Sequence, residues 1–566
     1  MSDKFRGWAW RAFLIVITVF GTLLSGCGGL RLITEEDAPT YSFDVNSKIY
    51  SNDYTLDEGP VKGGSANIYA SGMDSLNPLM TQNMYTREIM NLIYEGLYEM
   101  DTGLTARPLL ADSSERSEDG LTWKIYIKEN IQWHDGTELT SADVLYTIKR
   151  IQAYGDDCVY APLLANIANV IPDGKYAIVI RLKKVNSFTL ETLIFPIIPS
   201  HIEPRDDILD DGTPISEILI GTGPYKAGNY LPNESISLYF NEDVSVDGEG
   251  VAFGPPYIQE IKFIFIEKEK SVITEFQSGK LDGFFSRTVG FEHYRISSDM
   301  ISRSFSEREF EFIAFNLNRP GLSKVVRNAI ARIIDREAII RDVLDGNGIV
   351  ADFPVQPENW LGEMCAQPIS RDVKSAIESL ENGGYRLDFD SYSRPTSQGE
   401  MPLKFELLVN SGKPESVKTA EKIAEQLKEN WIIVNIVKVD SEEMKKRIKN
   451  GSFDMVITSF RVGVFCDMSL MYSEPYFDSD DSINISGYQN EEVDALVNAL
   501  FSDNDTAGRQ NDFAKLTSMI DEDMPYIGLY FHFSTTFLRN EIKGFEKPHV
   551  WNPYGSIRKW YIADYR

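Results

Sequence analysis

The strongest constraint on the fold is a regular alternation of strand and helix signals in the second half of the chain. Residues 405–409, 432–439 and 453–459 have the apolar pattern of buried strands. Between them, one helix pattern begins after Pro414 and another at Ser441, whose hydroxyl is expected to cap that helix. Strands and helices that alternate over so short a stretch predict an α/β layer with parallel pairing.

A second region with both kinds of signal lies nearer the N-terminus. Residues 65–70 and 123–127 read as strands, and Thr140 with Asp143 forms a T-x-x-D capping box that opens a helix. At 566 residues the chain is too long for one ordinary hydrophobic core. We therefore predict at least two α/β units.

The N-terminus has the parts of a secretory signal peptide. Basic residues precede an uncharged apolar run over 12–24, which ends in Leu24-Ser25-Gly26-Cys27. This arrangement resembles a bacterial lipoprotein signal. The resemblance implies that residues 1–26 are removed and that Cys27 carries a lipid. The alternative, an uncleaved membrane helix, is disfavoured because a spanning helix needs roughly 20 apolar residues.

The segment after Cys27 fits a connection to the membrane. Residues 27–62 are rich in small and polar side chains and show no sustained strand or helix period, so a flexible tether is expected. The alternative is an N-terminal arm that packs on the folded part. The predicted location is extracytoplasmic, with the protein lipid-anchored to the bacterial cell membrane, at the cell surface or in the periplasm.

Composition excludes some partners and leaves the cysteine chemistry open. The formal net charge of −29 provides no electrostatic footprint for nucleic acid. Besides Cys27, the cysteines are Cys158, Cys365 and Cys466, and three widely separated thiols do not make a disulfide framework. At most one bridge is possible among them, and its pairing stays open.

The sequence contains no recognisable catalytic or metal-binding motif. The five histidines have no ligand-spaced partners, and the H-E-x-x-H, C-x-x-C and G-x-S-x-G patterns are missing. We therefore expect no catalytic residues, no metal and no obligatory cofactor. This absence favours binding over turnover.

A series of short motifs appears in a characteristic order along the chain. They are Asp74-Ser75-Leu76-Asn77-Pro78, Tyr94-Glu95-Gly96-Leu97, Trp133-His134-Asp135-Gly136-Thr137, Gly221-Thr222-Gly223-Pro224-Tyr225, Val326-Arg327-Asn328-Ala329-Ile330, Tyr488-Gln489-Asn490 and Pro525-Tyr526. Together they resemble the peptide-binding (family 5) extracytoplasmic solute-binding proteins of ABC importers. The resemblance covers residues 63–566.

The resemblance implies an α/β, two-lobed fold of the type II periplasmic-binding-protein kind, with a hinge. By the family's layout, lobe I takes residues 63–308 and the C-terminal return 541–566, and lobe II takes 309–540. An inserted subdomain of lobe I is expected over about 98–210. Two crossing segments would form the hinge, which suits closure around a ligand.

The resemblance also implies two ligand-binding segments, one from each lobe. The expected contacts are Gln82, Asn83, Met84 and Tyr85 from lobe I, and Phe460, Arg461, Gly463 and Asp467 from lobe II.

The lobe II segment departs from the family's pattern. Peptide binders show Gly-Trp-x-Ala-Asp-Tyr after this strand, and the aspartate holds the ammonium group of the peptide. Here Phe460 replaces the tryptophan and Gly463 stands at the aspartate position. Asp467 could hold an ammonium group if the loop shifts by four residues, and its alternative role is that of a solvated loop carboxylate. Arg461 would instead favour a carboxylate or another acceptor-rich ligand.

The function expected from the resemblance is capture of oligopeptides or a peptide-like solute. A monomeric, lipid-anchored binding protein would deliver the solute to an ABC permease and ATPase complex. Two alternatives stay open: a peptide-sensing receptor of the same fold, and a surface hydrolase.

The lipoprotein signal generates a direct prediction. Cys27→Ser should abolish lipid attachment, because the thiol that carries the lipid is removed. Fractionation of cells and intact mass measurement should then find the protein outside the membrane fraction. A variant that stays uncut and membrane-bound would show that residues 12–24 are themselves the anchor.

Overall fold

The computed structural model describes part of one compact unit, which spans Ile49–Arg566. The described residues are 60–206, 213–242, 256–287, 300–365, 369–473, 483–502, 505–555 and 557–563. The predicted signal peptide, the predicted lipid site at Cys27 and nearly all of the predicted tether lie outside these residues.

An 11-stranded mixed sheet is the central element of the fold. Its strands are β1 (Ser65–Ala70), β8 (Tyr225–Leu231), β9 (Ser235–Phe240), β10 (Glu260–Phe265), β11 (Gly283–Ser286), β12 (Met300–Phe315), β13 (Gly348–Val350), β17 (Lys404–Asn410), β18 (Ile433–Val439), β19 (Met455–Arg461) and β20 (Tyr526–Arg539). Their order is β18-β17-β19-β12-β20-β11-β1-β10-β9-β8, and β13 pairs with β20. The predicted α/β units therefore share a single sheet.

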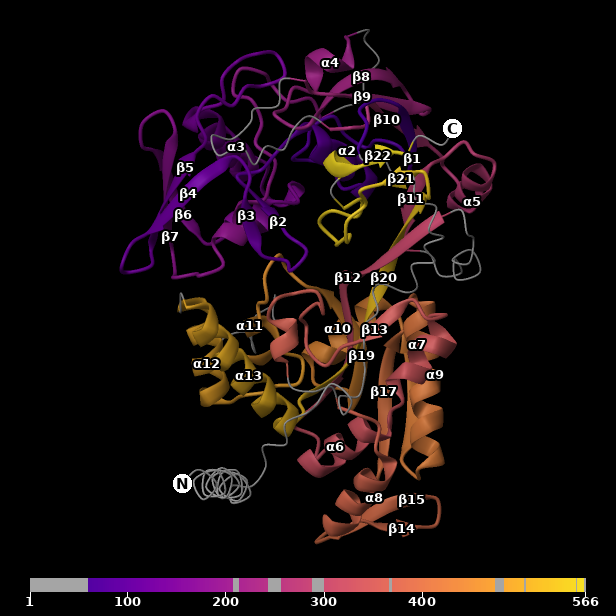
Figure 1. The fold of residues 1–566 in the computed structure, drawn as a ribbon. Helices are drawn as coiled ribbons and strands as arrows, with labels where there is room; N and C mark the ends of the chain where they lie inside the picture. The colour runs from indigo at the N-terminus through magenta and orange to yellow at the C-terminus, as the bar shows by residue number, and fades with distance from the viewer. Residues whose placement is uncertain are drawn as a thin grey trace, which may run out of the picture. The chain divides into compact units, whose positions relative to one another are not determined.

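The two longest strands, β12 and β20, are antiparallel neighbours in the middle of this sheet (Figure 1). On one side, β17 pairs in parallel with β18 and with β19, as the alternating pattern predicts. On the other side, β1 pairs in parallel with β10. The strand pair β12–β20 thus joins two stretches of sheet that each contain parallel strands.

Separate hydrophobic cores lie on the two sides of this strand pair. One core is built mainly from residues between 66 and 285, with Leu538 and Trp560 from the C-terminal part. The others are built mainly from residues between 310 and 531. β12 and β20 run from one side to the other, so they connect these cores. The proposed lobe boundaries at 308/309 and 540/541 fall within β12 and directly after β20, and they stay predictions.

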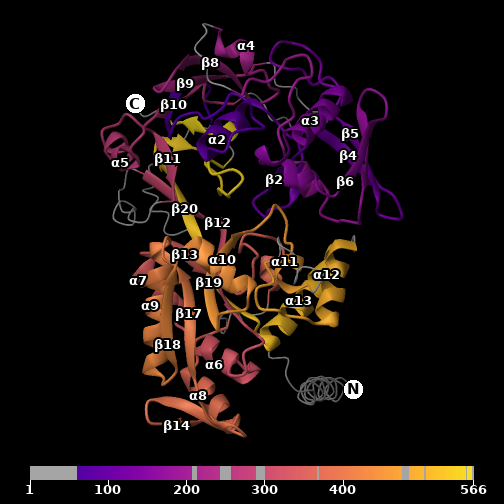
Figure 2. The same cartoon turned by 180° about the vertical axis from the view of Figure 1, so that it is seen from behind.

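Helices cover both stretches of the sheet. They are α2 (Met84–Ile93), α3 (Ser141–Tyr154), α4 (Ile215–Ile218), α5 (Glu269–Gln277), α6 (Lys324–Ile333), α7 (Arg336–Val343), α8 (Val373–Asn382), α9 (Pro414–Glu429), α10 (Ser441–Lys449), α11 (Ser469–Tyr472), α12 (Glu491–Ser502) and α13 (Thr506–Asp523). Helix α9 packs on β17 and β18, and α12 lies against α13 (Figure 2). No helix among the described residues is long and apolar enough to cross a membrane.

The observed helix caps show which of the helix starts predicted from the sequence are correct. Thr140 caps α3, and its capping box with Asp143 is present as predicted. Helix α9 begins at Pro414, also as predicted. The predicted cap at Ser441 is wrong, because Asp440 caps α10 and accepts a hydrogen bond from the Glu443 N–H. A carboxylate one residue earlier reaches the free N–H groups, so Ser441 becomes the first helical residue.

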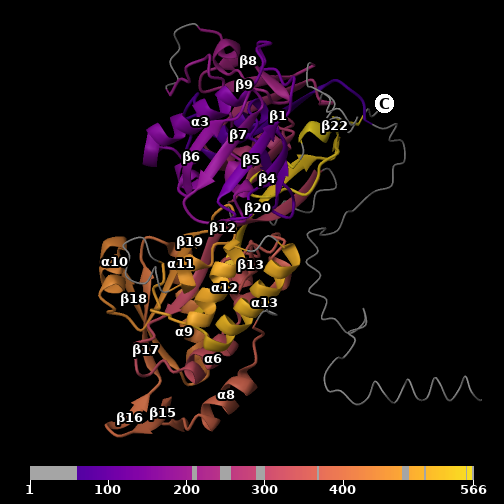
Figure 3. The ribbon, with the colours of Figure 1, turned by 90° about the vertical axis from the view of Figure 1, so that its left-hand side faces the viewer.

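Smaller sheets complete the fold. β4 (Ala111–Arg116), β5 (Thr122–Ile127), β7 (Ala177–Leu182) and β6 (Ile167–Pro172) form an antiparallel sheet in that order (Figure 3). The remaining pairs and triplets are β2 (Tyr98–Met100) with β3 (Ala106–Pro108), β14 (Arg386–Asp388) with β15 (Ser391–Thr396) and β16 (Gly399–Pro402), and β21 (Ile542–Lys543) with β22 (Tyr561–Ile562).

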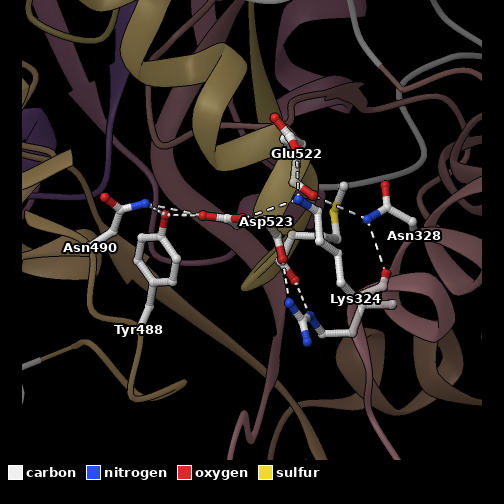
Figure 4. A network of polar contacts seen from close by, with 8 residues as sticks. Lys324, Asn328, Tyr488, Asn490, Glu522 and Asp523 are labelled. Atoms are coloured by element: carbon white, nitrogen blue, oxygen red, sulfur yellow. Dashed lines mark hydrogen bonds and ion pairs between the residues drawn. The ribbon is translucent and has the colours of Figure 1, made fainter. Parts of the chain in front are cut away.

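A polar network explains why several sequence motifs occur together (Figure 4). The Tyr488 hydroxyl donates to the Asp523 carboxylate at 2.7 Å, and the Asn490 amide donates to the same carboxylate at 3.3 Å. Lys324 pairs with it at 3.3 Å. Arg327 donates to the backbone carbonyls of Asp523 and Met524. The network fixes the end of α13 to the start of α6, so these motif residues have a structural role in this fold.

A buried carboxylate lies on β12, close to where the chain passes between the two cores. Glu311 is 2% exposed and accepts a hydrogen bond from the Ser416 hydroxyl at 2.6 Å. Burial raises its pKa to about 7, and the carboxylates of Glu309 and Glu415 add to this rise, whereas Ser416 and Lys413 oppose it. Ionised Glu311 is therefore poorly solvated.

Because the folded protein holds this proton more tightly than the unfolded chain, ionisation of Glu311 should cost stability as pH rises from about 4.5 to about 7. Glu311→Gln cannot ionise and can still accept from Ser416. The variant should gain on the order of 3 kcal/mol relative to the parent between pH 5 and pH 8. Urea unfolding at both pH values measures this gain.

The matched control is Glu429→Gln, which removes an exposed carboxylate from α9. Its stability should follow that of the parent at both pH values. Parallel pH profiles for the parent and Glu311→Gln would contradict the prediction.

Candidate ligand-binding site

The loop before α2 is organised by the Asp74 carboxylate. Asp74 accepts hydrogen bonds from the Thr81 hydroxyl, from the Gln82 N–H at 2.7 Å and from the Asn83 N–H at 2.9 Å. Three bonds to one carboxylate fix the backbone of this loop. The loop therefore sets where the first turn of α2 begins and which way its side chains point.

The predicted contacts Gln82 and Asn83 take part in local hydrogen bonds. Asn83 caps α2: its amide oxygen accepts from the Tyr85 N–H at 2.8 Å, and its amide nitrogen donates to the Ser71 hydroxyl at 2.9 Å. Gln82 is exposed and donates to the Asp157 carbonyl at 3.2 Å. These bonds give both residues a structural role, and their contact with a ligand stays a prediction.

Tyr85 and Met84 pack on the core of lobe I. The Tyr85 ring lies 4.9 Å from the Tyr69 ring and 4.7 Å from the Phe285 ring, measured between centroids. Its hydroxyl donates to the Phe285 carbonyl at 3.2 Å. Met84 is half-buried against the same core. Tyr85 thereby connects the first turn of α2 with the end of β11.

In lobe II, the predicted contacts follow β19. Phe460 is half-buried and packs edge-on against Phe310 and Phe312 of β12, with ring centroids 6.1 Å apart in both cases. Arg461, the last residue of β19, is exposed and stands opposite Glu309 in the strand register. Glu309 is already paired with Lys413 at 2.8 Å. Phe460 thus anchors the strand end, and Arg461 projects beyond it.

A small hollow lies beside the loop that follows β19. It is shallow and is lined by residues of the segments 354–359 and 462–466. Gly463 is exposed in this lining. A methyl group at Gly463 would meet nothing closer than the Phe465 carbonyl oxygen at 3.5 Å, so packing does not require glycine here.

Asp467 is half-buried at the end of this loop. Its carboxylate accepts hydrogen bonds from the Ser469 N–H at 3.0 Å and from the Ser469 hydroxyl. Burial raises the pKa of Asp467, while the bonds from Ser469 oppose the rise. Asp467 forms no ion pair within the described part of the chain. A cation that entered here would meet a partly desolvated acceptor.

The sequence did not single out Arg308 or Arg87, which lie near Arg461. The Arg308 guanidinium donates to the Val462 carbonyl at 2.8 Å and lies 4.4 Å from the centre of the Trp551 ring. Burial, together with the charges of Arg461 and Arg87, lowers the pKa of Arg308 to about 9. Arg87 follows Tyr85 by two residues, so extending the predicted lobe I segment along the helix would have included it. Nothing in the sequence distinguishes Arg308 from any other charged residue on a strand.

One loop of the predicted inserted subdomain packs on lobe II. Phe188 is 2% exposed, stacks on Phe465 at 5.3 Å and meets Phe501 edge-on at 5.9 Å. The Arg509 guanidinium lies 5.0 Å from the Phe188 ring. Next to it, the Ser187 N–H donates to the Phe501 carbonyl at 2.8 Å. The Phe188 contact therefore supports the loop that leads to Asp467.

The side chains that most often bind metal ions are not grouped together in the described part of the chain. Within the described residues, no group of three or more histidine, cysteine or acidic side chains could hold a metal ion. Cys158, Cys365 and Cys466 are free thiols.

Comparison with known proteins decides the family. Residues 105–481 match the bacterial extracellular solute-binding proteins, family 5, which is more than half of the chain. The chain belongs to this family.

Its relatives include binding proteins with different ligands. The oligopeptide-binding protein AppA of Bacillus subtilis is 25% identical over 520 residues, covering 89% of this chain and 92% of AppA. The nickel-binding protein NikA of Staphylococcus aureus is 24% identical over 520 residues, covering 89% of this chain and 96% of NikA.

Solved structures show the same fold. The unliganded open form of MppA, a periplasmic murein tripeptide binding protein, matches with a TM-score of 0.74 at 19% identity, covering 89% of this chain and 98% of MppA. The fold is therefore the two-lobed type II periplasmic-binding-protein fold that the sequence predicted.

Phe188→Ala should weaken the contact between the inserted subdomain and lobe II. Truncating a buried phenylalanine usually costs about 3–5 kcal/mol, so the melting temperature should fall. Solute affinity should fall as well, because the loop that carries Asp467 loses its support. Differential scanning calorimetry and titration calorimetry measure the two effects.

Phe389→Ala is the matched control, because Phe389 is 96% exposed. It should leave both quantities unchanged. If Phe188→Ala melts and binds like the parent, the Phe188 contact has no role in holding the site.

Proposed function

We propose that this protein is the solute-binding component of an ABC importer and that it captures oligopeptides or a peptide-like solute. The family match over residues 105–481 carries this proposal. The similarity to oligopeptide-binding AppA over most of both chains supports the ligand class. The bound form would be delivered to a membrane permease and its ATPase.

Binding would work by closure of two lobes. Lobe I comprises residues 63–308 and 541–566, with the inserted subdomain over about 98–210, and lobe II comprises 309–540. A solute that contacts both lobes stabilises the closed form by its difference in affinity for the two states. The paired strands β12 and β20 are the element that would bend.

The protein would act outside the cytoplasm. The lipobox-like sequence ending at Cys27 supports removal of residues 1–26 and attachment of a lipid to Cys27. The mature protein would be a monomer on a membrane tether, without catalytic activity and without an obligatory cofactor.

The ligand would lie between the segments that carry Tyr85 and Arg461. Asp467 is the candidate partner for the ammonium group of a peptide, because its carboxylate is partly desolvated and the residue directly follows Cys466, the last residue that lines the hollow. A charge-assisted hydrogen bond of this kind contributes roughly 1.5–3 kcal/mol.

Mass spectrometry of solute released by denaturing freshly purified protein tests the proposal. Peptides or peptide-like molecules should be released in stoichiometric amounts, and they should rebind to the refolded protein intact. Release of peptides that are cleaved on rebinding would favour a hydrolase. A bound metal that a strong chelator removes together with solute affinity would place the protein beside its nickel-binding relatives.

Asp467→Asn tests whether a free N-terminus is recognised. The asparagine oxygen can still accept from Ser469, so the loop should keep its structure while the negative charge is lost. Peptides with a free N-terminus should bind at least about tenfold more weakly. N-acetylated peptides should bind the parent poorly and respond little to the substitution. Titration calorimetry of both peptide types against both proteins measures this.

Asp388→Asn, an exposed carboxylate on β14, is the control and should bind like the parent. Equal affinities in all four combinations of peptide and protein would mean that Asp467 does not hold an ammonium group. The ligand would then be a blocked, cyclic or non-peptide solute.

A further inference from the structure

Four arginines lie on segments that contact one another: Arg308 donates to the carbonyl of Val462, next to Arg461, and Arg287 lies 3.4 Å from Glu307, next to Arg308. Arg87 follows Tyr85, whose ring packs on Phe285, two residues before Arg287. Arg87 projects from α2, Arg287 follows β11, Arg308 lies on β12 and Arg461 ends β19. Arg461 and Arg87 are the charged groups that act most strongly on Arg308, and Arg87 is also the strongest charged neighbour of Arg461. The cluster thus draws its members from both lobes and from the strand that connects them.

The carboxylates within range of this cluster are already engaged. Glu307 is 4% exposed, accepts from the Ser534 hydroxyl and lies 3.4 Å from the Arg287 guanidinium. Glu309 pairs with Lys413 at 2.8 Å and accepts from the Ser459 hydroxyl at 2.6 Å. Each carboxylate therefore has a cation or hydroxyl of its own.

Two of the four guanidinium groups have no partner among the described residues. Arg87 and Arg461 make no side-chain hydrogen bond and no ion pair there, whereas Arg308 is held by the Val462 carbonyl and the Trp551 ring. A guanidinium stays charged at physiological pH, and no ion pair among the described residues balances the charge of Arg87 or of Arg461.

The position of the four arginines favours a ligand over solvent as the group that balances their positive charge. The chain carries a net charge of −29, yet of the two carboxylates described near these four arginines, Glu307 pairs with Arg287 and Glu309 pairs with Lys413. Like charges this close repel one another, and bringing the lobes together would increase the repulsion. An anion with more than one charged group would remove the repulsion and would pair with guanidinium groups of both lobes.

We propose that the solute carries at least two carboxylates, which Arg87 and Arg461 bind from opposite lobes while Arg308 and Arg287 maintain the positive field. This inference rests on the proposed solute-binding function and narrows its substrate class. An acidic peptide and a small polycarboxylate share the required chemistry. The same charges couple binding to closure, because the lobes repel each other until the carboxylates enter.

Two matched sets of probes test the proposal by titration calorimetry. Peptides of three to six residues with glutamate at the internal positions are compared with the same peptides carrying glutamine, and citrate represents the small polycarboxylates. The proteins are the parent, Arg461→Gln and Arg87→Gln. The control is Arg341→Gln, an exposed arginine on α7 paired with its neighbour Asp342.

The glutamate peptides should bind the parent at least about tenfold more tightly than the glutamine peptides, and added salt should reduce this preference. Arg461→Gln and Arg87→Gln should each remove most of the preference and leave the glutamine peptides unchanged or slightly tighter. The melting temperature of the ligand-free variants should not fall, because each loses a repulsive charge. Arg341→Gln should behave like the parent.

Four outcomes separate the carboxylate inference from the proposed binding function. Equal binding of glutamate and glutamine peptides by the parent overturns the carboxylate inference and leaves the binding function standing. Binding of citrate alone, weakened by Arg461→Gln, supports the inference and overturns the peptide assignment. If glutamate and glutamine peptides and citrate all fail to bind, both are overturned. A fall in melting temperature for both arginine variants with unchanged solute preference identifies a structural cluster and also overturns the inference.

Discussion

The pairing of β12 with β20 is the interaction on which the rest of the structure depends. The two strands pair antiparallel from Met300 opposite Arg539 to Ala314 opposite Tyr526, with two register shifts between Ser306 and Phe312. Such irregularities bend and twist a strand locally. They occur where the chain passes between the hydrophobic cores, so one hydrogen-bonded ladder joins the lobes and contains the point at which they can bend.

Charged side chains of both signs gather at the irregular stretch of β12. The irregular stretch of β12 carries Glu307, Arg308, Glu309 and Glu311, and Arg461 stands next to it on β19. Ser534, Lys413 and Ser416 engage these carboxylates, whereas Arg461 has no ion pair among the described residues. The proposed anionic solute would pair with Arg87 and Arg461 as the lobes close, which would link the choice of solute to the conformational change.

Much of the local structure could be predicted, because hydrophobic period and capping act over a few residues. The strand at 65–70, the capping box of Thr140 and the start of α9 were predicted correctly, and the cap of α10 was misplaced by one residue. The single continuous sheet and the arginine cluster were not predicted, because they join residues more than 200 positions apart. The ligand contacts of Tyr85 and Asp467 stay predictions, since the loops around them are fixed by contacts that no sequence period reveals.

The central claim is that an anionic solute brings the two lobes together about β12 and β20. Pulsed electron–electron double resonance tests this claim directly by measuring the distance between two spin labels. The labels are attached at Glu118→Cys and Lys374→Cys in a protein that also carries Cys27→Ser and Cys365→Ala. After the co-purified solute is removed and then returned, the distance distribution should narrow and shift to shorter values, and Arg461→Gln should weaken the shift. A distribution that stays the same while solute binds would contradict the account.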